Sequence, residues 1–169
     1  MSPTVVPEAV RRAVAGGRCW GLELEPTWRV LALTVEPAGG ADVVQVLCAP
    51  VSVLLAALTR HDGDAPALVT FTEAQLPAVA QRLGGARIGP EPFGAPEPRP
   101  GAWGPRLSLE GRSSASDGTA STLLLDLSED DARLRLFARF DAAELRRADG
   151  TLLAGGVSAT GEPDGPAGP

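Results

Sequence analysis

The most regular pattern in the chain is the alternation at residues 133–140, RLRLFARF. Three arginines and Phe137 occupy one set of alternate positions, and apolar residues occupy the other. Strict alternation over such a length is typical of a β-strand with one buried face. A leucine-rich face must be covered by another part of the chain. We therefore expect a sheet packed against other elements, with three of these side chains buried: Leu134, Leu136 and Phe140.

Two preceding runs share this alternation. Residues 122–127 (TLLLDL) and 106–110 (RLSLE) carry leucines at every second position, and residues 128–132 form a polar loop of hairpin length. Together they predict an antiparallel three-stranded meander over about 106–140. Glu110 and Asp126 fall on the same side as the arginines, so we expect cross-strand ion pairs there rather than a binding site.

The first half of the chain has a similar alternation. Residues 20–25, 29–36 and 43–48 alternate, and turns at 26–27 and 38–41 separate them. This pattern predicts a second three-stranded meander over about 20–48. Trp20 falls on the side expected to face inward, and Cys48 falls with Val44 and Val46, which is typical of a buried thiol.

Helical spacing is found in two short segments. Apolar residues at 51, 54, 55 and 58 predict an amphipathic helix over about 51–60, and a similar pattern predicts a helix over about 77–83. A further short helix is expected over 7–15, at the periphery. The fold class we expect is α+β, with two antiparallel meanders and two short helices packed on the sheet. The pattern leaves open whether there is one curved sheet or two packed sheets.

Three segments are less regular. Residues 84–105 are rich in Pro and Gly but contain Ile88, Phe93 and Trp103, so we expect an ordered crossing loop or a binding loop. Residues 141–147 fit either a capped helical turn or an edge hairpin with 151–154; we favour the hairpin, because only Leu145 would anchor a helix. Residues 155–169 are expected to be a disordered tail after a single globular domain over 1–154.

The composition limits the classes of function. The chain of 169 residues has a formal charge of -6 and contains no Lys, Asn or Tyr, which indicates a GC-rich bacterial genome. An acidic protein of this kind is not expected to bind nucleic acid non-specifically. No apolar run approaches the roughly 20 residues of a membrane span, and the first residues lack the order of a signal peptide. We therefore expect a cytoplasmic protein that does not bind membranes.

Few residues suggest catalysis or metal binding. The chain has one His, at position 61 beside Asp62 and Asp64, and two Cys without a metal-binding spacing. Arg112 lies in a Ser- and Gly-rich segment that could hold an anion but is equally explained as a hairpin loop. Motifs for a nucleophile or a nucleotide are missing. We therefore assign no catalytic residue, metal or cofactor and favour a non-enzymatic protein.

The remaining signal is for protein contacts. Exposed tryptophans anchor interfaces, and we expect Trp28 beside a turn and Trp103 in the Pro/Gly-rich loop to be partly exposed. The predicted function is an accessory, regulatory or immunity-type subunit that binds a protein partner or a second copy of itself. The alternative is a small-molecule-binding domain or small enzyme with a pocket between sheet and helices, using carboxylates, Arg112 or His61. The predicted binding residues are Trp28, Phe93, Trp103 and Arg112.

Overall fold

A computed structural model describes residues 6–40, 42–62, 65–69, 71–99, 107–110, 121–129 and 131–155. Within these ranges the chain forms a mostly antiparallel sheet of nine strands with two short α-helices, so the sheet-dominated α+β class is confirmed. In chain order the elements are α1 (Glu8–Val14), β1 (Arg18–Glu25), β2 (Val30–Glu36), β3 (Val44–Asp62), β4 (Ala65–Val69), the 3-10 turn η1 (Glu73–Gln75), α2 (Leu76–Arg82), β5 (Ala86–Arg87), β6 (Leu107–Glu110), β7 (Ser121–Glu129), β8 (Ala132–Arg147) and β9 (Leu152–Gly155).

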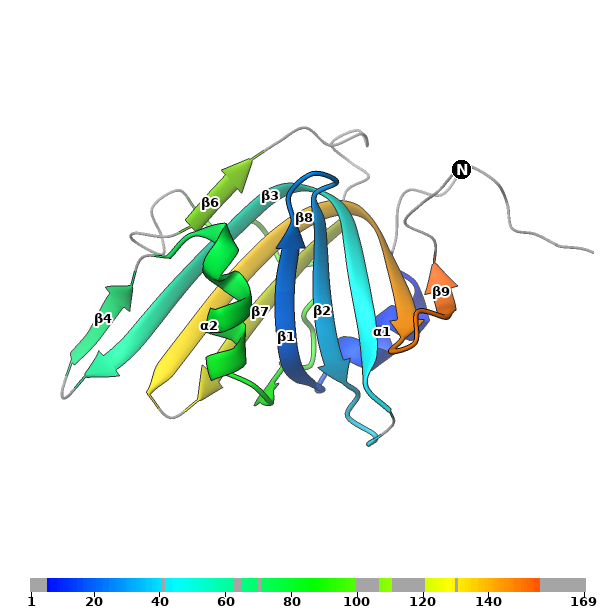
Figure 1. The fold of residues 1–169 in the computed structure, drawn as a ribbon, viewed down its shortest axis with the longest axis horizontal. Helices are drawn as coiled ribbons and strands as arrows, with labels where there is room; N and C mark the ends of the chain where they lie inside the picture. Colours follow the sequence, from blue (N-terminus) through cyan, green and yellow to red (C-terminus); the bar gives the residue numbers. More distant parts are fainter. Residues whose placement is uncertain are drawn as a thin grey trace, which may run out of the picture.

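Two long strands, β3 and β8, form the centre of the sheet (Figure 1). They pair antiparallel from Val44 opposite Arg147 to Arg60 opposite Ala132. The other edge of β3 is occupied in turn by β2, β6 and β4, and the other edge of β8 by β7 and β9. The main path through the sheet is β5-β1-β2-β3-β8-β7.

Both central strands arch over in the middle (Figure 1). The register of β3 against β8 is irregular between Val51 and Val53, and the Ser52 hydroxyl donates to the carbonyl oxygen of Arg139 at 3.3 Å. An extra residue of this kind bends a strand. Arg29 holds the bend from the side: its Nε donates to the carbonyl oxygen of Val51 at 2.6 Å, and the Val51 amide donates to the carbonyl oxygen of Arg29.

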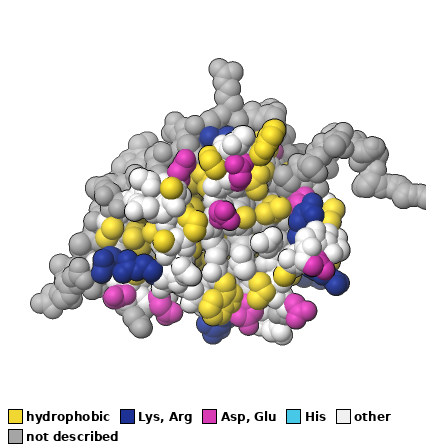
Figure 2. Space-filling model, viewed as in Figure 1, with side chains coloured by type: hydrophobic (Ala, Val, Ile, Leu, Met, Phe, Trp, Pro, Cys, Tyr) yellow, Lys and Arg dark blue, Asp and Glu magenta, His cyan; other side chains and the backbone are white. Residues whose placement is uncertain are grey.

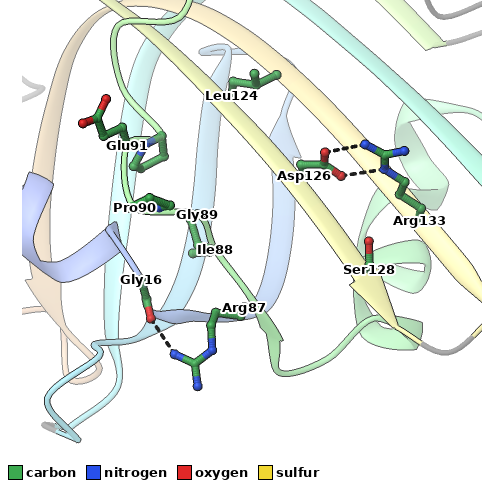
Figure 3. A pocket seen from close by; sticks show the side chains of 11 residues that line it. Gly16, Arg87, Ile88, Gly89, Pro90, Glu91, Leu124, Asp126, Ser128 and Arg133 are labelled. Carbon is green, nitrogen blue, oxygen red and sulfur yellow. Dashed lines mark hydrogen bonds and ion pairs between the residues drawn. The ribbon is translucent and has the colours of Figure 1, made fainter.

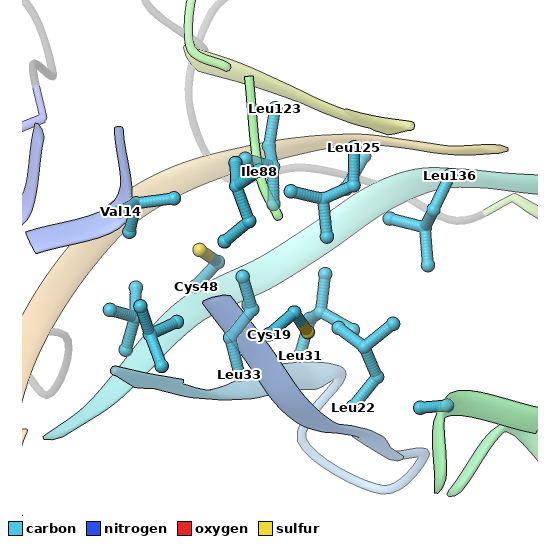
Figure 4. Close-up of a cluster of buried hydrophobic side chains, with 14 of the residues drawn as sticks. Val14, Cys19, Leu22, Leu31, Leu33, Cys48, Ile88, Leu123, Leu125 and Leu136 are labelled. Carbon is cyan, nitrogen blue, oxygen red and sulfur yellow. The ribbon is translucent and has the colours of Figure 1, made fainter. Parts of the chain in front are cut away.

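The arch and both helices enclose one apolar core (Figure 4). Leu134, Leu136 and Phe140 are fully buried, as the alternation at 133–140 predicts. Both cysteines are buried as well. Helix α1 is less peripheral than expected, because three of its residues join this core: Val10, Ala13 and Val14.

The predicted helix over 51–60 is wrong, because these residues belong to β3. Leu54, Ala56 and Leu58 face the main core. Leu55 and Ala57 lie on the opposite side, in a second cluster with Phe137. A strand buried on both faces carries a nearly continuous apolar run, and such a run also satisfies helical spacing. The helix predicted over 77–83 overlaps α2.

The predicted meander over 106–140 is also wrong in one strand. β7 and β8 form the expected hairpin, but β6 pairs with residues Val53–Ala56 of β3. Alternation identifies a strand but not its neighbour, and here the neighbour is about fifty residues earlier in the chain. At the other end, residues 141–147 continue β8, and β9 returns beside them as a hairpin.

The described part of the Pro/Gly-rich loop connects the two edges of the sheet. The Ile88 amide donates to the carbonyl oxygen of Gly17 at 2.7 Å, beside β1. A few residues later, the Leu124 amide of β7 donates to Pro92 at 2.7 Å, and Phe93 forms a bridge with Leu123. The side chain of Phe93 joins the main core. Residues 88–94, here called the closing segment, thus bring the β5 and β7 edges together.

We expect Phe93→Ala to lower the free energy of unfolding by about 3 kcal/mol, because truncation of a buried Phe typically costs about 3–5 kcal/mol. Urea denaturation measures the change. The matched control is Pro96→Ala, an exposed residue just beyond the closing segment. A loss below about 1 kcal/mol for Phe93→Ala, the range of ordinary surface substitutions, would contradict a role in closing the sheet.

The two buried thiols predict an unusual pH dependence. Burial raises the pKa of Cys19 to about 11 and raises the pKa of Cys48 further. In the unfolded chain a thiol has a pKa of about 8.5, so the stability contribution is complete below that pH and is lost as the pH rises toward the folded pKa. With no Lys or Tyr in the chain, the thiols dominate titration in this range. We expect a loss of about 2 kcal/mol per thiol between pH 7 and 10, measured by urea denaturation.

The double variant Cys19→Ala/Cys48→Ala is the control for this pH dependence. It is expected to be less stable at pH 7, because two buried side chains are shortened. Its stability should nevertheless change little between pH 7 and 10. An unchanged pH slope in the double variant would show that other groups cause the loss.

Candidate functional site

Trp20 lies on the outside of the sheet, which corrects the expectation that it faces inward. Its side chain is 47% exposed. The register between β1 and β2 shifts here: Cys19 lies opposite Val35, but Gly21 lies opposite Thr34. Trp20 is therefore the extra residue of a β-bulge, and Cys19 and Leu22 on either side both point into the core. Bulges redirect side chains in this way and are frequent beside functional sites.

The outward position of Trp20 is fixed by specific contacts. Its Nε1 donates to the Glu36 carboxylate at 2.9 Å. Its ring lies against Gly84 and Gly85 at the end of α2, so closely that a Cβ added to Gly85 would be 2.9 Å from ring atom Cη2. Gly85 also has a φ of +83°, a conformation that favours glycine. The indole is thus held on the surface in one orientation.

The Trp20 ring forms one wall of a groove of about 510 Å³, here called the Trp20 groove. It runs between α2 and the outer face of β1, β2 and β3, on the face shown in Figure 2, where apolar side chains lie beside isolated acidic ones. The lining combines small residues with larger polar and apolar ones. The lining residues are Trp20, Gly21, Leu22, Glu23, Ala32, Thr34, Gln45, Ala74, Pro77, Ala78 and Gln81.

One carboxylate in this groove is available for a ligand. Glu23 is exposed, and within the described residues its side chain has no hydrogen bond or ion pair. Glu25, two residues later, accepts the amides of Trp28 at 2.7 Å and Thr27 at 3.1 Å. The hydrogen bond from Trp28 is the main cause that lowers the pKa of Glu25. Glu25 thus shapes the β1–β2 turn, whereas Glu23 faces the groove.

A larger groove of about 800 Å³ lies between the closing segment and β7 (Figure 3). Its charged groups are mostly engaged within the chain. Arg133 binds Asp126 through two hydrogen bonds of 2.8 and 2.6 Å, which raise the pKa of Arg133. This pair confirms that Asp126 meets an arginine across the strands. Arg87 donates to the carbonyl oxygen of Gly16 at 3.0 Å. We therefore regard the Trp20 groove as the better candidate site.

Of the four predicted binding residues, the structure describes Trp28 and Phe93, and it places one on the surface and the other in the core. Trp28 is 75% exposed in the turn beyond the far end of β1 from Trp20. Phe93 is buried in the closing segment, where the Arg11 guanidinium lies 5.8 Å from the ring centre. Trp103 and Arg112 lie outside the described residues. A role for these four residues in binding stays a prediction.

Sequence reasoning missed Trp20, although a signal was present. Cys19, Leu22 and Leu24 do not fit a single alternation, and the break between Cys19 and Leu22 marks the bulge.

In the described ranges, no group of three His, Cys, Asp or Glu residues is placed to hold a metal ion. No helix in the same ranges is long and apolar enough to cross a membrane.

We expect Gly85→Ala to displace the Trp20 ring and to destabilise the protein by more than the backbone strain of an Ala at positive φ alone, which costs about 1 kcal/mol. Gly94→Ala is the matched control, because Gly94 has a φ of +94° and nothing within 4 Å of an added Cβ. Urea denaturation and the NMR shift of the Trp20 indole N–H measure the two effects. An equal loss of stability in both variants, with an unchanged shift of the Trp20 indole N–H, would contradict close packing of Trp20 on Gly85.

No protein-family model, curated protein or solved structure matches this chain.

Proposed function

We propose that the chain is a non-enzymatic protein-binding domain, an accessory or regulatory subunit, that receives a cationic side chain of its partner in the Trp20 groove. The observation that carries the proposal is the rigidly held, half-exposed Trp20 ring in the same groove as the unengaged Glu23. Tryptophan is enriched among the residues that dominate binding energy at interfaces. The two groups together select the chemistry of the partner.

A guanidinium or ammonium group fits this pair of residues. Indole faces attract cations, and Arg or Lys stacked on Trp gains about 0.5–2 kcal/mol. The Glu23 carboxylate supplies an opposite charge, and the net charge of -6 favours the approach of a basic partner over long range. Gly21 and Ala32 in the lining keep the groove open to the backbone of the partner.

The rival hypothesis of a pocket between sheet and helices receives less support. In the described part of the chain, side chains of the apolar core fill this space: Val10 and Val14 of α1 and Leu76 and Val79 of α2 are all buried there. The grooves open to the outside instead. Surface grooves with a rigid aromatic anchor favour a macromolecular partner over an enclosed small molecule.

The proposal is tested with synthetic peptides that carry a single Arg or Lys among Gly, Ser and Leu, and with the same peptides carrying Glu. Binding is followed by the NMR shift of the Trp20 indole N–H and by fluorescence anisotropy. We expect the Arg and Lys peptides to bind and the Glu peptides not to bind. Trp20→Ala should weaken binding about tenfold or more, as for an interface anchor, and Glu23→Gln several-fold.

Two control variants make this test specific. Trp28→Ala removes another exposed tryptophan outside the groove, and Glu91→Gln removes an exposed carboxylate beside the other groove. Both should leave peptide binding unchanged. Loss of binding with Trp28→Ala but not with Trp20→Ala would move the contact site to the β1–β2 turn. Equal binding of Glu peptides would refute a cation site.

A further inference from the structure

Exposed apolar side chains gather at the β9 end of the molecule, away from the Trp20 groove. Among the described residues, three of the five exposed large apolar side chains lie here: Val43 at 38%, Leu152 at 46% and Leu153 at 41%. Val43 and Leu153 line the same groove of about 600 Å³, between the start of β3 and the β8–β9 turn. Exposed apolar side chains that gather in one place are candidates for an interaction surface.

The strand that carries two of these residues has an open edge. β9 pairs with β8 on one side, through Leu145 opposite Ala154 and Arg146 opposite Leu152. Within the described ranges no strand pairs with its other side, and Figure 1 places β9 at the margin of the sheet. Its sequence, LLAG, has neither a charge nor a proline. Charges and prolines are two of the devices that protect the edge strands of natural monomers; β9 has instead a length of only four residues and a register shift at Leu153.

We propose that the occupant of this edge is a second copy of the chain, paired antiparallel through β9 across a two-fold axis. A strand edge is complementary to itself under two-fold symmetry, because each copy offers the same donors and acceptors in reverse order. The two sheets would then continue from β8 through both β9 strands. Leu152 and Leu153 of each copy would be covered by the other.

The charges around this edge are compatible with self-association. The groove beside β9 contains charges of both signs, with Arg147 next to Asp149 and Asp42 across the groove. Hydrogen bonds from Thr151 lower the pKa of Asp149, so this carboxylate stays ionised near neutral pH. Two copies related by a two-fold axis can therefore place an arginine of one near a carboxylate of the other, without the repulsion that a patch of one sign would cause.

Sedimentation of the full chain over about a hundredfold range of concentration tests the proposal, because a dimer dissociates by mass action on dilution. At high concentration we expect twice the mass of the 17.3 kDa chain. Leu153→Glu should give the single-chain mass, since the substitution would bury a charge from each copy between the two β9 strands. Trp28→Glu is the control, and it should remain dimeric. A wild-type chain that stays monomeric throughout, or a dimer lost only in Trp28→Glu, would overturn the proposal.

A second measurement does not depend on a disruptive substitution. Cysteines placed one at a time at Leu152, Leu153 and Ala154 should form an intermolecular disulfide on mild oxidation at the position nearest the axis, whereas Trp28→Cys should not. The natural cysteines are buried and do not compete. Failure of all three positions to cross-link would exclude a β9 dimer. The β9 variants should leave peptide binding in the Trp20 groove unchanged, so the two proposals fail independently.

Discussion

The pairing of β3 with β8 is the constraint on which the rest of the structure depends. All the other strands except β1 and β5 pair directly with one of these two. β1 pairs with β2, and β5 pairs with β1. The pair is buried on both faces where Phe137 packs against Leu55 and Ala57 on the outer side. Because both strands bend together near Ser52, one continuous sheet can wrap around its own core. The sequence pattern was compatible with one curved sheet or two packed sheets, and the long β3–β8 pairing gives one curved sheet.

Closure of this curved sheet also positions the candidate site. The chain leaves α2 through Gly84 and Gly85, enters β5 beside β1, and then crosses to β7 as the closing segment. The connection from α2 to β5 must pass close to the bulge of β1, and its glycines leave room for the Trp20 ring. The same segment that completes the core therefore fixes the indole on the surface. Closure and site geometry are physically linked.

The elements predicted correctly from the sequence are those whose pattern has a single physical explanation. Residues 133–140 alternate because one face meets the core and the other carries ionised groups such as Arg133. The helix prediction for residues 51–60 is wrong because burial on both faces removes the alternation, and the remaining apolar run also fits a helix. The strand with which β6 pairs could not be predicted from local alternation, because β3 is distant in the sequence. The outward direction of the Trp20 side chain depends on one extra residue in β1, and this bulge does not change the composition of the strand.

The contrast between Trp20 and Trp28 shows that the more exposed tryptophan is not the more rigidly held one. For Trp28, the described contacts fix the backbone through Glu25 and leave the side chain largely in solvent. For Trp20, the Glu36 hydrogen bond and the packing on Gly85 restrict the ring itself. A side chain that is already ordered loses less conformational entropy on binding, so more of its contact energy contributes to affinity. This difference in order is the reason why the proposed function rests on Trp20, although Trp28 is the more exposed of the two.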